Sequence, residues 1–457
     1  MARVVIIGGG ISGCATAVAA IKAGAEVTLL ERTDLLLGAA LMAGYINQGG
    51  RFCLAEEAKA MGGGEILHVL ESLNLTKQGK GGRRPLAPAA IAAQLTGYSF
   101  DLGRLEPIIR KLLQEMGIQM RLCSRAVDVK RVGDHLDAVK LASGEWLEGD
   151  AFVDCTGTSG GLANCIRYGK GCVMCLIFRC PTFGDRVSIV AKAGVQEVMA
   201  RRPDGTPGLC HHAMHLYKES LSPELQETLR SKGRAAISIK HIVNPSEYTS
   251  VFYSHRVYQG LDPETGIAFS PETATSDPFC LEEMELGASE VPGLASSPNV
   301  PYLPYDKLRK IPGLENALIV FPQGGKSNVV WGLALTPRES SLRVADRDNL
   351  FVAGEKVAAI GVIECMVTGL LAGHNAVRTA LGKKLVVLPP TTSTGDYIAF
   401  LAETMQSEEN LTGFYGASSG LYLTRMVERN LFTSDIAKIK SNIEEAGLTN
   451  IYAGRMT

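Results

Sequence analysis

The chain has 457 residues, of which 46% are hydrophobic and 20% charged. This composition excludes a disordered protein and is long enough for two or three packed cores. Lys plus Arg number 46 against 47 Asp plus Glu, which leaves a net charge of −1. A charge this close to zero excludes binding of nucleic acid or an anionic membrane by the whole surface, although a local basic patch is compatible with it.

The sequence contains no apolar run long enough to span a membrane, which needs about 18 consecutive apolar residues. The apolar stretch that starts at Val4 lacks the basic segment and cleavage site of a signal peptide. We therefore expect a cytoplasmic protein with no membrane partner. In that compartment the eleven cysteines are expected to be thiols, metal ligands or redox groups rather than disulfides.

The first thirty-two residues have the pattern of a β-α-β unit. An apolar run at Val4–Ile7 leads into Gly8-Gly9-Gly10-Ile11-Ser12-Gly13, and an Ala-rich helical pattern follows up to Ala23. A second apolar run covers Val27–Leu30 and is followed by Glu31. A G-x-G-x-x-G segment between a strand and a helix is typical of dinucleotide binding.

Each glycine of this unit has an expected role. Gly8 allows the sharp turn after the strand, Gly10 lets the backbone approach a pyrophosphate, and Gly13 lets helix and strand pack closely. Glu31 stands where a carboxylate accepts hydrogen bonds from a ribose 2′-hydroxyl, and an acid there disfavours a 2′-phosphate. The ligand is therefore FAD or NAD. The expected contacts from this unit are Gly8, Gly10, Ser12, Gly13, Glu31 and Arg32.

Two later segments favour FAD over NAD. Residues 146–157 read as a strand that leads into Cys155-Thr156-Gly157, which resembles the short turn of flavoproteins of the two-dinucleotide type. Residues 349–355 read as a strand ending in Gly354-Glu355, and a helix is predicted over 363–380. This arrangement resembles the flavin-closing motif of the glutathione-reductase-like FAD fold, which implies that the acid contacts the ribityl chain. The other expected cofactor contacts are Val127, Thr156, Gly157, Gly354, Glu355 and Gly361.

The order of these segments predicts the architecture. We expect an α/β fold in which a glutathione-reductase-like FAD-binding Rossmann domain is formed from two sequence pieces, residues 1–160 and 340–390. Residues 161–339 are expected to form an inserted mixed α+β substrate domain, and residues 391–457 a helical C-terminal segment.

Local patterns add detail to this scheme. Hydrophobic spacing predicts a helix over 103–117, and the strand-like run 118–127 after it is expected to extend the edge of the sheet. In the inserted region, 236–239 and 317–320 read as short strands and 223–232 as a helix.

The segment Ala353–Val377, with the following Val387–Gly395, resembles two families of tRNA-modifying flavoproteins. These are the folate- and FAD-dependent tRNA uracil-5-methyltransferases (TrmFO) and the glucose-inhibited division protein A family (MnmG). Residues 309–317 resemble the first family as well, and the likeness covers about a third of the chain. The glycines and the glutamate that match both families are Gly354, Gly361, Glu364, Gly369 and Gly373.

The resemblance has implications for chemistry. It implies uracil methylation in tRNA or rRNA with methylenetetrahydrofolate, and Cys53 falls at a place comparable to that of the family's cysteine nucleophile. The region 101–157 instead resembles the broad class of FAD-dependent oxidoreductases of unassigned substrate.

Four cysteines are concentrated in one short segment with the spacing C-x6-C-x2-C-x4-C-P. They are Cys165, Cys172, Cys175 and Cys180. One interpretation is an iron–sulfur cluster that passes electrons to the flavin. The alternatives are a redox dithiol of Cys172 and Cys175, or a buried strand in which the thiols are inert.

Two further motifs have both a functional and a structural interpretation. Cys210-His211-His212 with His215 has imidazoles at a spacing that suits a metal, but the start of a surface helix is the simpler interpretation. The basic loop from Lys77 to Arg84 could contact phosphate or RNA, or be an ordinary solvated loop.

The leading hypothesis from sequence is an FAD-dependent oxidoreductase that transfers hydride or electrons between flavin and a substrate bound between the FAD and inserted domains. No second complete G-x-G-x-x-G unit is present, so NAD(P)H, a folate or an electron-carrier protein remain alternative reductants. The second hypothesis is a methylenetetrahydrofolate-dependent RNA methyltransferase, although the near-neutral charge does not favour an RNA partner. The third is a flavin-binding module without catalysis.

Overall fold

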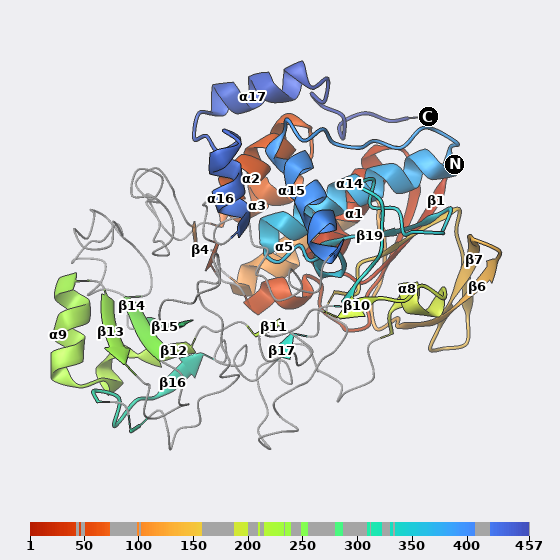
Figure 1. Ribbon diagram of the computed structural model, residues 1–457. Coiled ribbons are helices and arrows are strands. Elements are labelled where there is room, and N and C mark those ends of the chain that lie inside the picture. Colours follow the sequence, from red (N-terminus) through yellow and green to blue (C-terminus); the bar gives the residue numbers. More distant parts are fainter. Residues whose placement is uncertain are drawn as a thin grey trace.

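The computed structural model describes most of both ends of the chain and short parts of its middle (Figure 1). The described residues are 1–42, 45–46, 51–73, 98–99, 102–157, 187–199, 209–210, 214–232, 234–238, 248–254, 279–286, 309–310, 312–321, 330–331, 334–406 and 421–456. None of the helices within these ranges combines the length and apolar character needed to cross a bilayer.

A five-stranded parallel sheet forms the centre of the molecule. Its order is β19-β9-β1-β2-β5, with β1 (Arg3–Ile7) in the middle, β2 (Glu26–Leu30) on one side and β9 (Ala151–Asp154) on the other. The outer strands are β5 (Gln119–Arg121) and β19 (Leu350–Val352). Strand β19, although far away in sequence, thus pairs directly with β9. The parallel sheet with helices packed on it confirms the expected α/β fold class.

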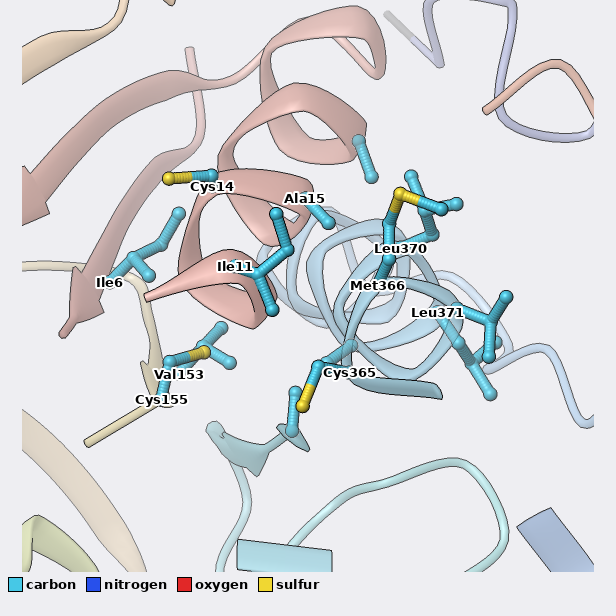
Figure 2. Close-up of a cluster of buried hydrophobic side chains, with 14 of the residues drawn as sticks. Ile6, Ile11, Cys14, Ala15, Val153, Cys155, Cys365, Met366, Leu370 and Leu371 are labelled. Carbon is cyan, nitrogen blue, oxygen red and sulfur yellow. The ribbon is translucent and has the colours of Figure 1, made fainter. Parts of the chain in front are cut away.

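Helices α1 (Ile11–Lys22) and α14 (Val362–Ala380) lie side by side against this sheet, as Figures 1 and 2 show. A side-chain carbon at Gly369 would clash with the Ser12 carbonyl oxygen, and one at Gly373 would clash with that of Thr16. Because both contacts advance in the same direction along the chain, the two helices run parallel. The predicted helix over 363–380 is confirmed, and its small residues form the contact with α1.

We expect Gly373→Val to destabilise the protein severely, because the new side chain would occupy the place of the Thr16 backbone. The expected loss in the free energy of unfolding is at least about 3 kcal/mol, measured by urea titration. Gly382→Ala is the control, since a side-chain carbon there has open space around it. Its φ of +65° limits the cost to backbone strain of about 1 kcal/mol. Equal stability of the two variants would contradict the tight helix contact.

The structure corrects the expectation for residues 118–127. Strand β5 does extend the edge of the parallel sheet, but it ends at Arg121, and Cys123 then takes a left-handed conformation with φ of 53°. The chain enters a separate antiparallel sheet made of β6 (Ala126–Val132), β7 (His135–Leu141) and β8 (Trp146–Glu148). The stretch that reads as one strand therefore belongs to two sheets.

The described part of the middle region contains a second five-stranded sheet of order β13-β14-β15-β12-β16. Helix α9 (Pro223–Lys232) matches the predicted helix and packs beside β13. The pairings within this sheet are antiparallel. The strands are β12 (Met214–Tyr217), β13 (Arg234–Ser238), β14 (Tyr248–Ser254), β15 (Phe279–Leu286) and β16 (Ile319–Phe321).

The C-terminal helices pack on α2 (Arg51–Ala60) (Figure 1). Helix α15 (Ser393–Glu403) begins beside Glu57 of α2, whose buried carboxylate accepts hydrogen bonds from the Ser393 and Thr394 amides, each 2.7 Å long. A carboxylate at a helix N-terminus is stabilised by the free N–H groups there. Thus α2 lies between α14 and the C-terminal helices α15 and α17.

The remaining elements are short or peripheral. They are η1 (Gly38–Met42), β3 (Tyr45–Ile46), α3 (Glu65–Ser72), β4 (Tyr98–Ser99), α5 (Leu102–Glu115), α8 (Ile189–Lys192), β10 (Val198–Met199), β11 (Leu209–Cys210), η2 (Lys218–Ser220), β17 (Val330–Trp331), β18 (Ala334–Leu335), η3 (Gly354–Val357), η4 (Thr404–Gln406), α16 (Leu421–Glu428) and α17 (Ile436–Glu445).

Candidate functional site

The loop between β1 and α1 contains Gly8, Gly10 and Gly13. Of these three, Gly10 alone has open space where a side chain would be. Gly8 has φ of +104°, and a side-chain carbon there would lie 2.5 Å from the Cys155 carbonyl oxygen. A side-chain carbon at Gly13 would clash with the Gly8 carbonyl oxygen, whereas one at Gly10 would meet nothing within 4 Å among the residues that the structure describes. Gly10 is also the N-cap of α1, which has no side-chain cap. The open space at this helix N-terminus suits a pyrophosphate.

Glu31 lies at the end of β2 with its carboxylate directed at the same loop. It is 8% exposed, and its Oε2 accepts a hydrogen bond from the Gly9 amide at 2.9 Å. Its Oε1 accepts from the amide and the hydroxyl of Thr33, at 2.8 and 3.0 Å. A carboxylate has about four acceptor sites and three are used here, so one ribose hydroxyl can still donate to it. The half-buried Arg32 follows directly.

The Val127 segment runs beside this end of the site. The amide of Ser124, three residues earlier, donates a 2.8 Å hydrogen bond to the Glu31 carbonyl oxygen. Val127 itself lies in β6, where the pairing with β7 is irregular between Ala126 and Asp128. Its contact with a cofactor remains a prediction.

The structure brings four other predicted cofactor residues, Ser12, Gly157, Gly354 and Glu355, close to one another. A side-chain carbon at Gly354 would lie 2.6 Å from the Ser12 hydroxyl, and one at Gly157 would lie 3.3 Å from the Glu355 carboxylate. Ser12, Gly157 and the pair Gly354-Glu355 thus meet at the start of α1, although they come from three distant parts of the sequence. Their contact with a cofactor is a prediction that this proximity supports.

A buried network of charged side chains supports the segments that carry Gly157 and Glu355. Asp154, at the end of β9, accepts hydrogen bonds from the amide and hydroxyl of Thr156 at 3.0 and 2.7 Å. Its other oxygen accepts from the first two amides of α8, at 2.9 and 3.1 Å. The Lys356 ammonium lies 3.8 Å from Asp154 and 2.8 Å from Glu197, and its side chain is fully buried.

A second buried ion pair lies at the start of α14. Arg51 Nε donates a 2.6 Å hydrogen bond to Glu364 Oε1, and the two side chains are 14% and 0% exposed. Gly361, the N-cap of α14, has φ of +128°, and a side-chain carbon there would lie 2.6 Å from the Arg51 guanidinium and clash with the Glu364 carboxylate. Gly361 therefore leaves the room that both charged groups occupy.

Three buried thiols surround the same loops (Figure 2). Burial raises the pKa of Cys155 to about 12, and burial also raises the pKa values of Cys14 and Cys365 well above the usual range. These side chains are protonated at neutral pH. They fill the core among β1, α1 and α14 beside Ile6 and Ile11.

Cys53, the predicted nucleophile, lies on the buried face of α2. It is 0% exposed, and its thiol donates a 3.2 Å hydrogen bond to the Thr433 carbonyl oxygen. Burial raises its pKa from 9.0 to about 12, so the thiolate is disfavoured in the fold. Its role as a nucleophile remains a prediction, and this environment does not favour it.

We expect iodoacetamide at pH 8 to alkylate the exposed Cys123 in the native protein and to leave Cys53 unmodified. The raised pKa means that Cys53 stays protonated until the pH approaches 12, and the thiolate is the reactive form. Peptide mass spectrometry measures both sites, and the urea-unfolded protein, in which both are alkylated, is the control. Rapid labelling of native Cys53 would show an accessible thiolate and favour the nucleophile role.

Several predicted sites lie outside the described residues. These are the cluster Cys165, Cys172, Cys175 and Cys180, the basic residues Lys77, Lys80, Arg83 and Arg84, and His211 and His212. Cys210 and His215 are described in their backbone alone. In the part of the chain that the structure describes, no group of three His, Cys, Asp or Glu side chains could hold a metal ion. The cluster remains a prediction.

Three residues of the site, Arg51, Asp154 and Lys356, are not predicted from the sequence. Asp154 could have been found, because it immediately precedes the recognised Cys155-Thr156-Gly157 turn. Arg51 and Lys356 carry no such signal, since a lone cation in sequence is normally taken as exposed.

Comparison with known proteins supports the resemblance in both sequence pieces. Residues 3–164 match the family model "FAD dependent oxidoreductase", and residues 302–384 match "Glucose inhibited division protein A". The methylenetetrahydrofolate–tRNA-(uracil-5-)-methyltransferase TrmFO of Bacillus cereus is 34% identical over 130 residues, which are 27% of this chain and 29% of that protein. The TrmFO of Bacillus mycoides is 38% identical over 101 residues, 21% and 22% of the two chains. The match thus spans less than a third of these relatives.

The fold is shared more widely than the sequence. Aquifex aeolicus GidA, in two crystal forms, superposes with a TM-score of 0.53 at 16% and 17% identity, over 97% of this chain and 76% and 78% of GidA. The expected fold class is thereby confirmed at the level of the FAD-type domain. The chain has the fold of GidA and resembles the FAD-dependent oxidoreductases of the TrmFO and GidA families.

Proposed function

We propose that the chain binds FAD along the line from Glu31 through Gly10 to Gly361 and is an FAD-dependent oxidoreductase. The observation that supports this most is the open space at Gly10, where α1 begins without a side-chain cap. Glu31 lies on one side of this space, and Ser12, Gly157 and Glu355 meet on the other.

The two sides of Gly10 differ in what they can bind. Glu31 accepts hydrogen bonds and suits the ribose of the adenosine half, so the other half of the dinucleotide must extend the opposite way. Gly369 of α14 lies against Ser12, and Gly361 comes eight residues earlier, which is about 12 Å of helix. The start of α14 therefore extends beyond the pyrophosphate position by more than the length of a ribityl chain.

The residues present fit this cofactor. The α1 N-terminus offers backbone N–H groups to the phosphates, and the Glu355 carboxylate can accept from ribityl hydroxyls. FAD, once bound, supplies a centre that accepts or donates a hydride or single electrons. The Asp154 and Lys356 network holds Thr156, Gly157 and Glu355 in place for it. The substrate is a small molecule or an electron carrier.

The test is anaerobic reduction of the FAD-loaded protein. Flavin absorbance is followed after addition of NADH, NADPH or methylenetetrahydrofolate, one at a time, and free FAD at the same concentration is the control. We expect at least one donor to bleach the bound flavin much faster than it bleaches free FAD. A flavin that binds and is reduced by none of them, nor reoxidised by any acceptor, would make the chain a flavin-binding module instead.

A second candidate is uracil methylation of tRNA with methylenetetrahydrofolate, which the TrmFO matches favour. The buried Cys53 and the net charge of −1 count against it. Transfer of labelled methylene carbon to unmodified tRNA tests this function directly. Transfer that is lost in Cys53→Ala would establish it, and no transfer by the FAD-loaded protein would exclude it.

Iron and sulfide analysis of protein purified without oxygen tests the proposed cluster of Cys165, Cys172, Cys175 and Cys180.

A further inference from the structure

The ion pair of Arg51 and Glu364 lies at the end of α14 that the proposed cofactor approaches. Arg51 is the first residue of α2, and Glu364 lies in the first turn of α14. The bond between them is 2.6 Å long, and the Glu364 side chain is fully buried. An Arg51 nitrogen is also 3.5 Å from the Ile360 carbonyl oxygen, so the guanidinium reaches across the start of the helix.

The position of this pair is constrained by Gly361. Both charged groups lie where a side chain of residue 361 would be, so they cover the N-cap of α14 itself. A helix N-terminus carries partial positive charge, and a carboxylate there cancels much of it. Arg51 offsets that carboxylate. With the pair intact, the two side-chain charges offset each other and the N-terminus keeps its positive character.

We propose, building on the proposed FAD site, that Arg51 and Glu364 are positioning residues whose opposite charges set the reduction potential of the bound flavin. Reduction adds negative charge to the flavin, so a nearby buried anion opposes reduction and a nearby buried cation favours it. The effect is large because both side chains are withdrawn from water, where charges would be screened. The electrons themselves come from the reductant, and neither side chain takes part in their transfer.

The two single substitutions should act in opposite directions. Glu364→Gln removes the carboxylate that contacts Arg51, and a guanidinium stays protonated at every accessible pH. It should favour the reduced flavin by about tenfold, which is about 30 mV for two electrons. Arg51→Gln removes the cation that contacts the Glu364 carboxylate and should favour the oxidised flavin by a similar factor. The double variant, with neither charge, should lie within about threefold of the wild type.

A matched control exists elsewhere in the protein. Arg425 and Asp396 form a 2.9 Å ion pair with 16% and 0% exposed side chains, in α16 and α15. Arg425→Gln should also lower thermal stability, because it removes one of the two cations, Arg425 and Arg429, that pair with the buried Asp396 carboxylate. Arg425→Gln should leave the flavin potential unchanged. If Arg51 and Glu364 had a structural role alone, their variants would show the same pattern as Arg425→Gln, which is lower thermal stability with an unchanged flavin potential.

The experiment is a reductive titration of the FAD-loaded protein with xanthine and xanthine oxidase against a reference dye, with thermal unfolding of each apoprotein in parallel. Potentials that move in opposite directions for Glu364→Gln and Arg51→Gln support the proposal. Unchanged potentials in a Glu364→Gln variant that still binds FAD overturn it. Failure of the folded wild type to bind FAD overturns the proposed function instead, so the two failures are distinct.

Discussion

Replacement of Gly10 by Val should leave the apoprotein folded and abolish FAD binding. The backbone at Gly10 has φ of −64° and ψ of 178°, which any residue adopts, and no other described segment has an atom within 4 Å of its side-chain position. The cost to the free energy of unfolding should be within about 1 kcal/mol. The isopropyl group fills the space proposed for the pyrophosphate, so the FAD dissociation constant should rise at least about 100-fold.

Gly8→Ala is the contrasting variant. A side-chain carbon at Gly8 would lie 2.5 Å from the Cys155 carbonyl oxygen, and its φ of +104° is unfavourable for any other residue. Gly8→Ala should therefore unfold the apoprotein at a lower urea concentration, whereas Gly10→Val should not. Fluorescence titration with FAD and urea unfolding measure the two effects. A Gly10→Val protein that binds FAD as the wild type does would place the pyrophosphate elsewhere.

Lys356→Met should be strongly destabilising. The lysine is fully buried between Asp154 and Glu197, at 3.8 and 2.8 Å, and it also donates to the Ser188 hydroxyl at 2.7 Å. Removing one partner of a buried ionic network leaves uncompensated charge, at a cost of about 3–5 kcal/mol. Because the network supports Thr156 and Gly157, FAD affinity should also fall.

The controls for this variant use the same region. Lys192→Met on the exposed surface of α8 should change the free energy of unfolding by less than about 0.5 kcal/mol. Adding Glu197→Gln to Lys356→Met removes one of the two stranded carboxylates and should recover part of the loss. Urea unfolding followed by circular dichroism measures all three. No loss in Lys356→Met, or no recovery in the double variant, would contradict a network held together by charge.

The elements predicted from sequence with most success are those with a regular local pattern. The alternation of strand, glycine loop and Ala-rich helix predicted β1, α1 and β2 closely, because apolar periodicity and turn glycines are local signals. The helix at 363–380 was predicted within one residue at its start. The prediction of one strand over 118–127 was wrong, because the chain turns at Cys123 in a left-handed conformation that no sequence pattern indicates for a cysteine.

The glycines and the acidic residues of the site could be predicted from sequence, whereas its buried cations could not. Gly10, Glu31 and Glu355 occupy motif positions from which their roles can be predicted. Arg51 and Lys356 are buried only because distant segments supply Glu364 and Glu197, which are 313 and 159 residues away in the chain. Pairings at such separation depend on the tertiary fold and cannot be seen in a local pattern.

The most direct test of the central claim is the binding of FAD to the deflavinated wild-type protein, followed by quenching of flavin fluorescence. We predict saturable binding of one FAD per chain, weakened at least about 100-fold in Gly10→Val. Absence of saturable binding by a protein that circular dichroism shows to be folded would contradict the account.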